Sequence, residues 1–116
     1  MNADKLVTVD LDAEELEIWI AGLREAPEEV PREEFESRVG TSWAGLDQIR
    51  DELKAHRGAG GSTTVTISAE QLAVVHRCLV ATVEGLGVEE FHTRVGYSWE
   101  TGQRVLGRLA ALVASV

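Results

Sequence analysis

Five side chains of this 116-residue chain have the chemistry of a ligand site: His76, His92, Tyr97, Trp43 and Trp99. Histidine exchanges protons near neutral pH, and tryptophan and tyrosine combine a flat apolar ring with one polar atom. Together they indicate a groove for a small molecule, in which a histidine could also act as a general acid or base. Because a histidine on an apolar helix face is more often a packed core residue, this groove is the second of our interpretations.

No metal or cofactor is expected from the sequence. His76 and Cys78 are two residues apart in a helical segment, so their side chains leave the helix on different sides and cannot easily share one metal ion. Asp10 and Asp12 lack the glycine and the spacing of a calcium-binding loop. The chain also has no glycine-rich phosphate loop and no Gly-x-Ser-x-Gly elbow, which favours a non-enzymatic protein.

The segments that must position these residues are written twice. EEFESRVGTSWAG begins at Glu33, and EEFHTRVGYSWET begins at Glu89. At a constant offset of 56 residues, 17 of 49 aligned positions are identical without a gap, which shared composition does not explain. The sequence therefore predicts one domain made of two repeats, 5–57 and 63–116, joined by a glycine linker at 58–62.

Each repeat is predicted to begin with a strand and a helix. Alternating β-branched runs, LVTVDL from Leu6 and TTVTI from Thr63, favour the strands. Asp12 and Ser68 then stand at N-cap positions, each followed three residues later by Glu or Gln, which is the pattern of a capping box. Apolar residues recur at helical spacing after each cap: Leu16, Trp19, Ile20 and Leu23, and Leu72, Val75, His76 and Leu79.

An irregular stretch, PEEVP or EGLGV, is predicted to lead into a short helix, a glycine turn and a third helix. Gly40 suits the left-handed end of the short helix, and Ser42 suits the N-cap of the next one. The third helix of the first repeat carries Trp43, Leu46, Ile49 and Leu53 at helical spacing. We interpret the tryptophans first as core anchors, and Glu34 with Arg38 and Glu90 with Arg94 as ion pairs within one helix.

A repeat with one strand cannot bury its apolar face or complete a sheet by itself. We therefore expect a mostly helical α+β fold, in which the two copies pack about a pseudo-two-fold axis with their strands antiparallel. The turn between the last two helices of each repeat also resembles that of a helix-turn-helix. DNA binding is nevertheless the weakest interpretation, because the helix after Ser42 offers only Arg50 and Lys54 against three acidic residues.

The charge of −9 lies almost entirely in the first half, where 15 acidic and seven basic residues give residues 1–58 a net charge of −8. Our leading hypothesis is a small non-enzymatic protein that docks a basic protein partner, as an immunity protein, an inhibitor or a regulatory adaptor does. The acidic surface that we expect to carry this binding comprises Glu28, Glu29, Glu33, Glu36, Asp47 and Asp51.

Several features indicate where the protein works. The N-terminus lacks the pattern of a signal peptide, and no uninterrupted apolar stretch is long enough to span a membrane. The single cysteine, Cys78, agrees with a reducing compartment, and nine arginines against two lysines are typical of a GC-rich bacterial genome. We expect a cytoplasmic bacterial protein with no membrane partner, whose further self-association stays open.

Overall fold

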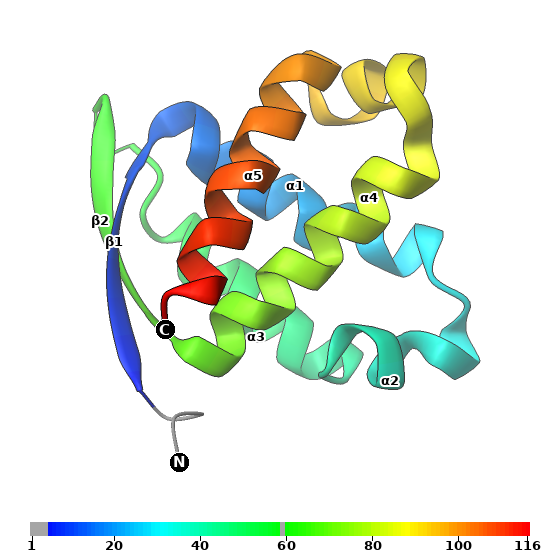
Figure 1. Ribbon diagram of the computed structural model, residues 1–116, viewed down its shortest axis with the longest axis horizontal. Coiled ribbons are helices and arrows are strands. Elements are labelled where there is room, and N and C mark those ends of the chain that lie inside the picture. The colour runs from blue at the N-terminus through cyan, green and yellow to red at the C-terminus, as the bar shows by residue number, and fades with distance from the viewer. Residues whose placement is uncertain (1–4, 59) are drawn as a thin grey trace.

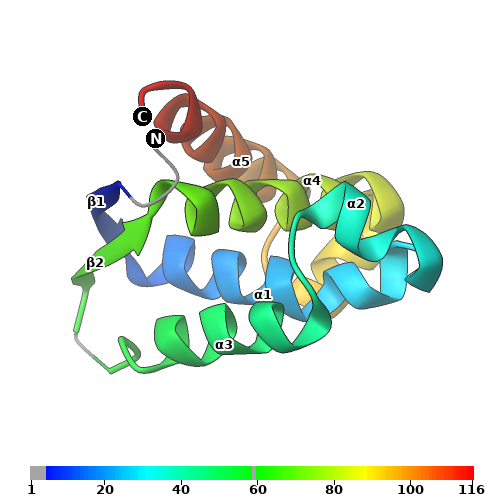
Figure 2. The ribbon, with the colours of Figure 1, turned by 90° about the horizontal axis from the view of Figure 1, so that it is seen from below.

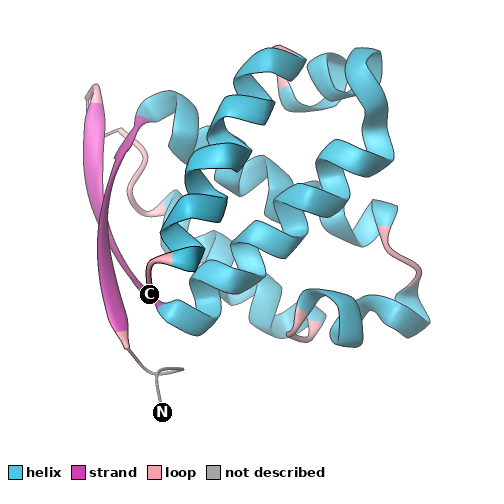
Figure 3. Cartoon of the chain, in the orientation of Figure 1, coloured by secondary structure: helices cyan, strands magenta, loops and turns pink. Residues whose placement is uncertain are grey.

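A computed structural model describes residues 5–58 and 60–116 and has a mostly helical α+β fold (Figures 1 and 3). In chain order the elements are β1 (Leu6–Asp12), α1 (Ala13–Glu29), the 3-10 helix η1 (Arg32–Glu34), α2 (Phe35–Val39), α3 (Trp43–Lys54), β2 (Ser62–Ser68), α4 (Ala69–Val95) and α5 (Trp99–Ala114). The predicted fold class, mostly helical with a small antiparallel sheet, is confirmed.

The two strands form an antiparallel ribbon along one side of the molecule (Figure 1). Their pairing is continuous over the seven residues of each strand, and Val9 lies opposite Val65. Because side chains alternate between the two faces of a strand, every second residue enters the core. The buried strand residues are Val9, Leu11, Val65 and Ile67.

The core lies between α1 and α4, and the four long helices are stacked in the order α3, α1, α4, α5 (Figure 2). The close approach of α1 and α4 depends on Gly22, where a Cβ atom would lie only 3.2 Å from the Cα of Leu79. Next to this contact, the hydroxyl of Thr82 donates to the carbonyl oxygen of Gly22 at 3.2 Å. The central helix pair therefore leaves little room for larger side chains at position 22.

The helix ends form at the predicted capping residues. Asp12 Oδ1 accepts a hydrogen bond of 2.7 Å from the backbone amide three residues later, and Ser68 Oγ accepts one of 3.0 Å in the same way. Both capping boxes are complete. Gly40, with φ of 95°, and Gly96, with φ of 88°, end α2 and α4 in the left-handed conformation that glycine tolerates. These predictions are confirmed.

The stretches predicted to be irregular are more helical than expected. Helix α1 includes Pro27 and ends at Glu29, so only the two residues before η1 are irregular in the first half. In the second half α4 continues to Val95, and Gly87 is its one residue outside helical dihedral angles, with φ of 75° and ψ of 177°. The irregular stretch predicted over 84–88 is therefore reduced to Gly87, because one glycine with a positive φ makes the whole turn.

The predicted ion pairs within the short helices do not form among the residues that the structure describes. Arg94 instead reaches α1, where its Nη2 lies 2.8 Å from Oε1 of Glu25 rather than near Glu90. Glu25 is only 4% exposed, and Arg24 Nε lies 2.9 Å from its other oxygen. Arg24 also donates to the carbonyl oxygen of Arg94 at 2.8 Å. These charges join the two halves of the chain, which the spacing within one helix could not reveal.

Helix α4 has the length and apolar composition of a membrane span, although it meets that criterion only marginally. It is the central helix of the fold, packed between α1 and α5 (Figure 2), and the turn at Gly87 interrupts it. A helix buried in the core of a folded domain can have the same composition.

Candidate functional site

The corner between α2 and α3 displays a tryptophan. Ser42 Oγ accepts a hydrogen bond of 3.1 Å from the amide of Gly45, which fixes Trp43 as the first residue of α3. The Trp43 ring packs edge-on against buried Phe35 with 6.1 Å between the ring centroids, and the guanidinium carbon of Arg32 lies 4.6 Å from the Trp43 ring centroid. A pocket of about 190 Å³ lies here, lined by Arg32, Phe35, Glu36, Ser42 and Trp43.

Trp43 is 42% exposed, so the prediction that it anchors the core is wrong. Phe35 already fills the core at this end, and Trp43, in the first turn of α3, covers Phe35 from outside. The buried side of α3 is formed by Leu46, Ile49 and Leu53 on the following turns. Trp19 of α1 is fully buried, so it is the one tryptophan of the three that lies entirely in the core.

The six acidic residues of the predicted partner surface lie on the elements around this corner. Glu28 and Glu29 end α1, Glu33 belongs to η1, Glu36 to α2, and Asp47 and Asp51 to α3. All except half-buried Glu29 are exposed. In the described part of the chain, Asp47 is the only one of the six in an ion pair, at 3.1 Å from Arg50. The corner therefore carries an excess of uncompensated negative charge beside the exposed Trp43 ring.

The equivalent corner of the second half holds the other predicted ligand residues. Trp99 packs edge-on against Phe91 with 5.9 Å between the ring centroids, and it is half-buried. His92 is exposed on the last turn of α4, and Tyr97 is half-buried in the turn that follows. Trp43 begins α3, which lies on the opposite side of the α1–α4 pair from α5 (Figure 2). The structure therefore does not gather the five predicted residues into one groove.

His76 and Cys78 lie in the middle of α4 in different surroundings. His76 is half-buried, and its pKa is lowered by burial and, to a lesser extent, by the charge of Arg77. Cys78 is fully buried, and burial raises the pKa of its thiol to about 12. The imidazole is therefore mainly neutral at neutral pH, and the thiol stays protonated, so Cys78 cannot serve as a nucleophile or a metal ligand in this state.

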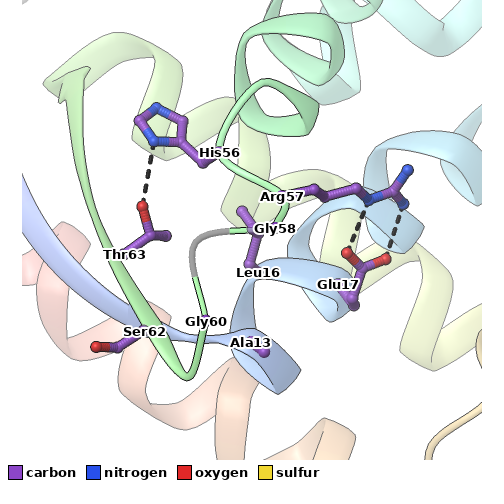
Figure 4. Close-up of a pocket in the computed structure, with 9 residues that line it drawn as sticks. All are labelled: Ala13, Leu16, Glu17, His56, Arg57, Gly58, Gly60, Ser62 and Thr63. Carbon is purple, nitrogen blue, oxygen red and sulfur yellow. Dashed lines mark hydrogen bonds and ion pairs between the residues drawn. The ribbon is translucent and has the colours of Figure 1, made fainter.

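A pocket of about 180 Å³ lies where the connection from α3 to β2 passes α1 (Figure 4). Arg57 donates to both carboxylate oxygens of Glu17 at 2.8 and 2.7 Å, which raises the pKa of Arg57. His56 Nδ1 lies 3.3 Å from the hydroxyl oxygen of Thr63, and the His56 and Arg57 side chains extend to opposite sides (Figure 4). Arg57 and His56 are both bound to other side chains of the chain, so we interpret these contacts as structural, joining the α3–β2 connection to α1 and β2. The contact between Arg57 and Glu17, 40 residues apart, leaves no signal in the sequence.

A third pocket, of about 260 Å³, lies between the corner and the start of α4. Its wall is mostly polar and comes from two parts of the chain that are distant in sequence. The residues that line it are Gly40, Thr41, Gly45, Gln48 and Ile49 from the first half, and Ser68, Glu70, Gln71 and Val74 from the second. The sequence did not indicate this site, because its two walls meet only after α3 and α4 have packed on α1.

Comparison of the chain with protein-family models, with curated proteins and with solved structures finds no match. The feature that stands out is an exposed tryptophan with an arginine over its ring and Glu36 in the same pocket, beside a second, polar pocket.

Proposed function

We propose that this protein is a non-enzymatic binding module, which docks a basic protein partner through the acidic surface around Trp43. The exposed Trp43 ring carries the proposal, because tryptophan and arginine are the residue types most enriched among those that dominate binding energy. In the folded chain the ring contacts Phe35 edge-on and has the Arg32 guanidinium over it, so little side-chain entropy is lost when a partner covers it.

The acidic residues around the Trp43 ring give the proposal its choice of partner. Glu33 in η1 and Glu36 in α2 are exposed, and neither forms an ion pair with a residue that the structure describes. Such a field attracts cationic surfaces and repels phosphate backbones, which favours a basic protein over DNA. We expect complementary charge to act chiefly on the rate of association and on its dependence on salt.

The proposal also takes the chain to be an internal duplication arranged about a pseudo-two-fold axis. In support, β2 begins 56 residues after β1, and the antiparallel register sets Val9 opposite Val65, its own counterpart at that offset. A two-fold axis through a strand pair requires such a pairing of equivalent residues. The edge-on pair of Phe35 and Trp43 likewise recurs at the same offset. One copy could thus change its surface residues while both copies kept the fold.

The proposed place of action is the cytoplasm, where Cys78 stays reduced.

The test is affinity capture from a lysate of the source organism, followed by kinetics with the purified partner. Trp43→Ala is expected to weaken the complex about thirtyfold, as loss of a central tryptophan contact does. Trp99→Ala, the same change at the equivalent corner, is the matched control and should leave binding unchanged. Neutralising Glu33 and Glu36 as glutamines should slow association at low salt and should matter little at high salt.

The proposal fails if the captured partner is not basic, or if Trp43→Ala and Trp99→Ala weaken binding equally. It also fails if binding ignores ionic strength, because the acidic surface would then have no part in it. Circular dichroism of each variant separates loss of binding from loss of fold.

A further inference from the structure

In the second half of the chain, arginines from α5 cover the start of α1. Arg104 Nη2 lies 2.5 Å from Oε1 of Glu14. Arg108 pairs with the carboxylate of Glu15 and also donates to the backbone oxygen of Asp10 at 2.9 Å. Residues of the second repeat thus fill the groove between the last helix of their own copy and the first helix of the other. We call the contacts of Arg104 and Arg108 with the start of α1 the arginine clamp; all of its residues belong to this one chain.

The same groove on the other side of the molecule is open. Subtracting 56 from the clamp residues of α5 leads to Gln48 and Glu52 on α3, and adding 56 to Glu14 leads to Glu70 on α4. Gln48 and Glu70 both line the polar pocket of about 260 Å³. Thr41, which also lines it, is the counterpart of the much larger Tyr97. The pocket exists because shorter side chains stand where the second repeat has an arginine and a tyrosine.

The open groove keeps Glu70, the counterpart of Glu14, and has Gln48 and Glu52 in place of the two clamp arginines. A cation at its edge is Arg77, whose Nη1 donates to the carbonyl oxygen of Val39 at 3.3 Å. Among the residues that the structure describes, Glu70 and Glu52 form no ion pair, and the nearest partner of Glu52 is the amide of Gln48 at 3.4 Å. Glu52 lines a small adjoining hollow together with Thr66, the counterpart of Asp10. Gln71 replaces Glu15 and removes one carboxylate, so the groove has acceptors for one guanidinium rather than two.

We propose that this pocket binds one arginine side chain of the basic partner, in the way that Glu14 of the first repeat binds Arg104 of the second. The inference rests on the proposed function and adds to it a site and a side-chain type. An arginine suits the pocket better than a lysine, because a planar guanidinium can reach a carboxylate and a neighbouring amide oxygen together. The filled counterpart shows that the fold accepts a guanidinium against Glu14, the residue equivalent to Glu70.

The pocket and the Trp43 surface lie on either side of one turn. Ser42 and Trp43 line the tryptophan pocket, whereas Thr41 and Gly45 line the polar one. A single basic segment crossing this turn could therefore cover the Trp43 ring and insert an arginine beside Glu70. Two such contacts on one segment strengthen each other, since the second forms within an existing complex.

The experiment titrates the full-length protein with N-acetyl-arginine amide and follows backbone amide signals by NMR. We expect saturable shifts at Gln48, Glu70 and Gln71, with weaker binding of N-acetyl-lysine amide. Glu70→Gln should weaken the arginine probe about fivefold or more, which is the scale of one charge-assisted hydrogen bond. Because Glu70 is exposed, this variant should keep its fold.

A second pair of variants exchanges the two sides of the molecule. Thr41→Tyr with Gln48→Arg copies the second repeat into the first and should abolish probe binding, with Glu70 now occupied from within. Tyr97→Thr with Arg104→Gln should open the counterpart groove and produce new shifts at Glu14. Absence of saturable shifts at millimolar probe, or binding that ignores Glu70→Gln, overturns the inference.

The two proposals can fail separately. If the arginine probe does not bind while the basic partner still requires Trp43, the pocket inference is wrong and the partner surface stands. If the probe binds beside Glu70 but Trp43→Ala leaves the captured partner in place, the surface proposal is wrong and the arginine site stands.

Discussion

Two glycines of α5, five residues apart, are expected to respond oppositely to replacement by alanine. At exposed Gly107 an added Cβ atom meets nothing within 4 Å. At buried Gly102 it would lie 2.4 Å from Cζ and 2.7 Å from Cε1 of Phe91. The Phe91 ring is 0% exposed and is fixed by its edge-on contact with Trp99, so it has no free space to enter.

The free energy of unfolding follows from two opposing effects. Replacing glycine by alanine inside a helix favours the folded state by about 1 kcal/mol, and Gly107→Ala should gain about that much. Gly102→Ala has the same gain but must also displace a buried ring, which costs about 2–3 kcal/mol, the upper part of the range for overpacking. The net expectation for Gly102→Ala is a loss of about 1–2 kcal/mol, or about 4–8 °C in Tm.

Urea unfolding followed by circular dichroism, with a thermal scan as a second measure, gives both values. The two variants control for each other, because they share the helix, the residue type and the substitution. If Gly102→Ala were as stable as the natural chain, the close packing of Phe91 against α5 would be refuted. If Gly107→Ala were destabilising, the exposed position of that side of α5 would be refuted instead.

Three further predictions follow from burial and from the interlocked halves. Native Cys78 should react with a thiol reagent no faster than the protein unfolds, because its pKa of about 12 keeps the reactive thiolate scarce; rapid labelling in native buffer would contradict its burial. The pKa of His76 is lowered by burial, so the unfolded chain binds more protons in mild acid, and the free energy of unfolding should fall as the pH drops through the ordinary histidine range. His76→Ile, which copies Ile20 of the first half, should flatten that part of the pH profile, and an unchanged slope between about pH 7 and pH 5 would assign it to other groups. Residues 1–57 and 58–116, expressed apart, should each fail to fold as a monomer, since each keeps one strand of the pair and one of the two central helices; a cooperatively folded monomer in sedimentation and circular dichroism would mean that the halves are independent.

Local signals in the sequence were sufficient for the strands, the caps and the glycine turns. Asp12 and Ser68 satisfy free amide groups at helix starts, and Gly40 and Gly96 take up dihedral angles that other residues avoid. Each of these features depends on interactions between residues no more than four apart, so a short stretch of sequence is enough to predict it. The irregular stretch expected over 84–88 is helical on both sides of Gly87, because nothing else in that segment ends a helix.

The ion pairs and the exposure of tryptophan depended on contacts that a short window does not contain. Arg94 pairs with Glu25 rather than with Glu90. Glu25 is buried, and a buried carboxylate without an ion-pair partner costs more free energy than an exposed one. Trp43 and Trp99 occupy the same place in the repeated phrase, yet only Trp43 is exposed. The two tryptophans differ in exposure because α3 and α5 pack against different neighbouring helices.

The positions where the two copies agree and those where they differ therefore answer different questions. Phe35 and Phe91 agree because each must pack under a tryptophan at the end of the core. Where the copies differ, as at Gln48 and its counterpart Arg104, the fold is kept while one groove is filled and the other left open. If the chain is an internal duplication, as we propose, one repeat serves as a comparison structure for the other. On that proposal, the pairing of Arg104 with Glu14 identifies arginine as the side chain that we expect the pocket beside Glu70 to bind.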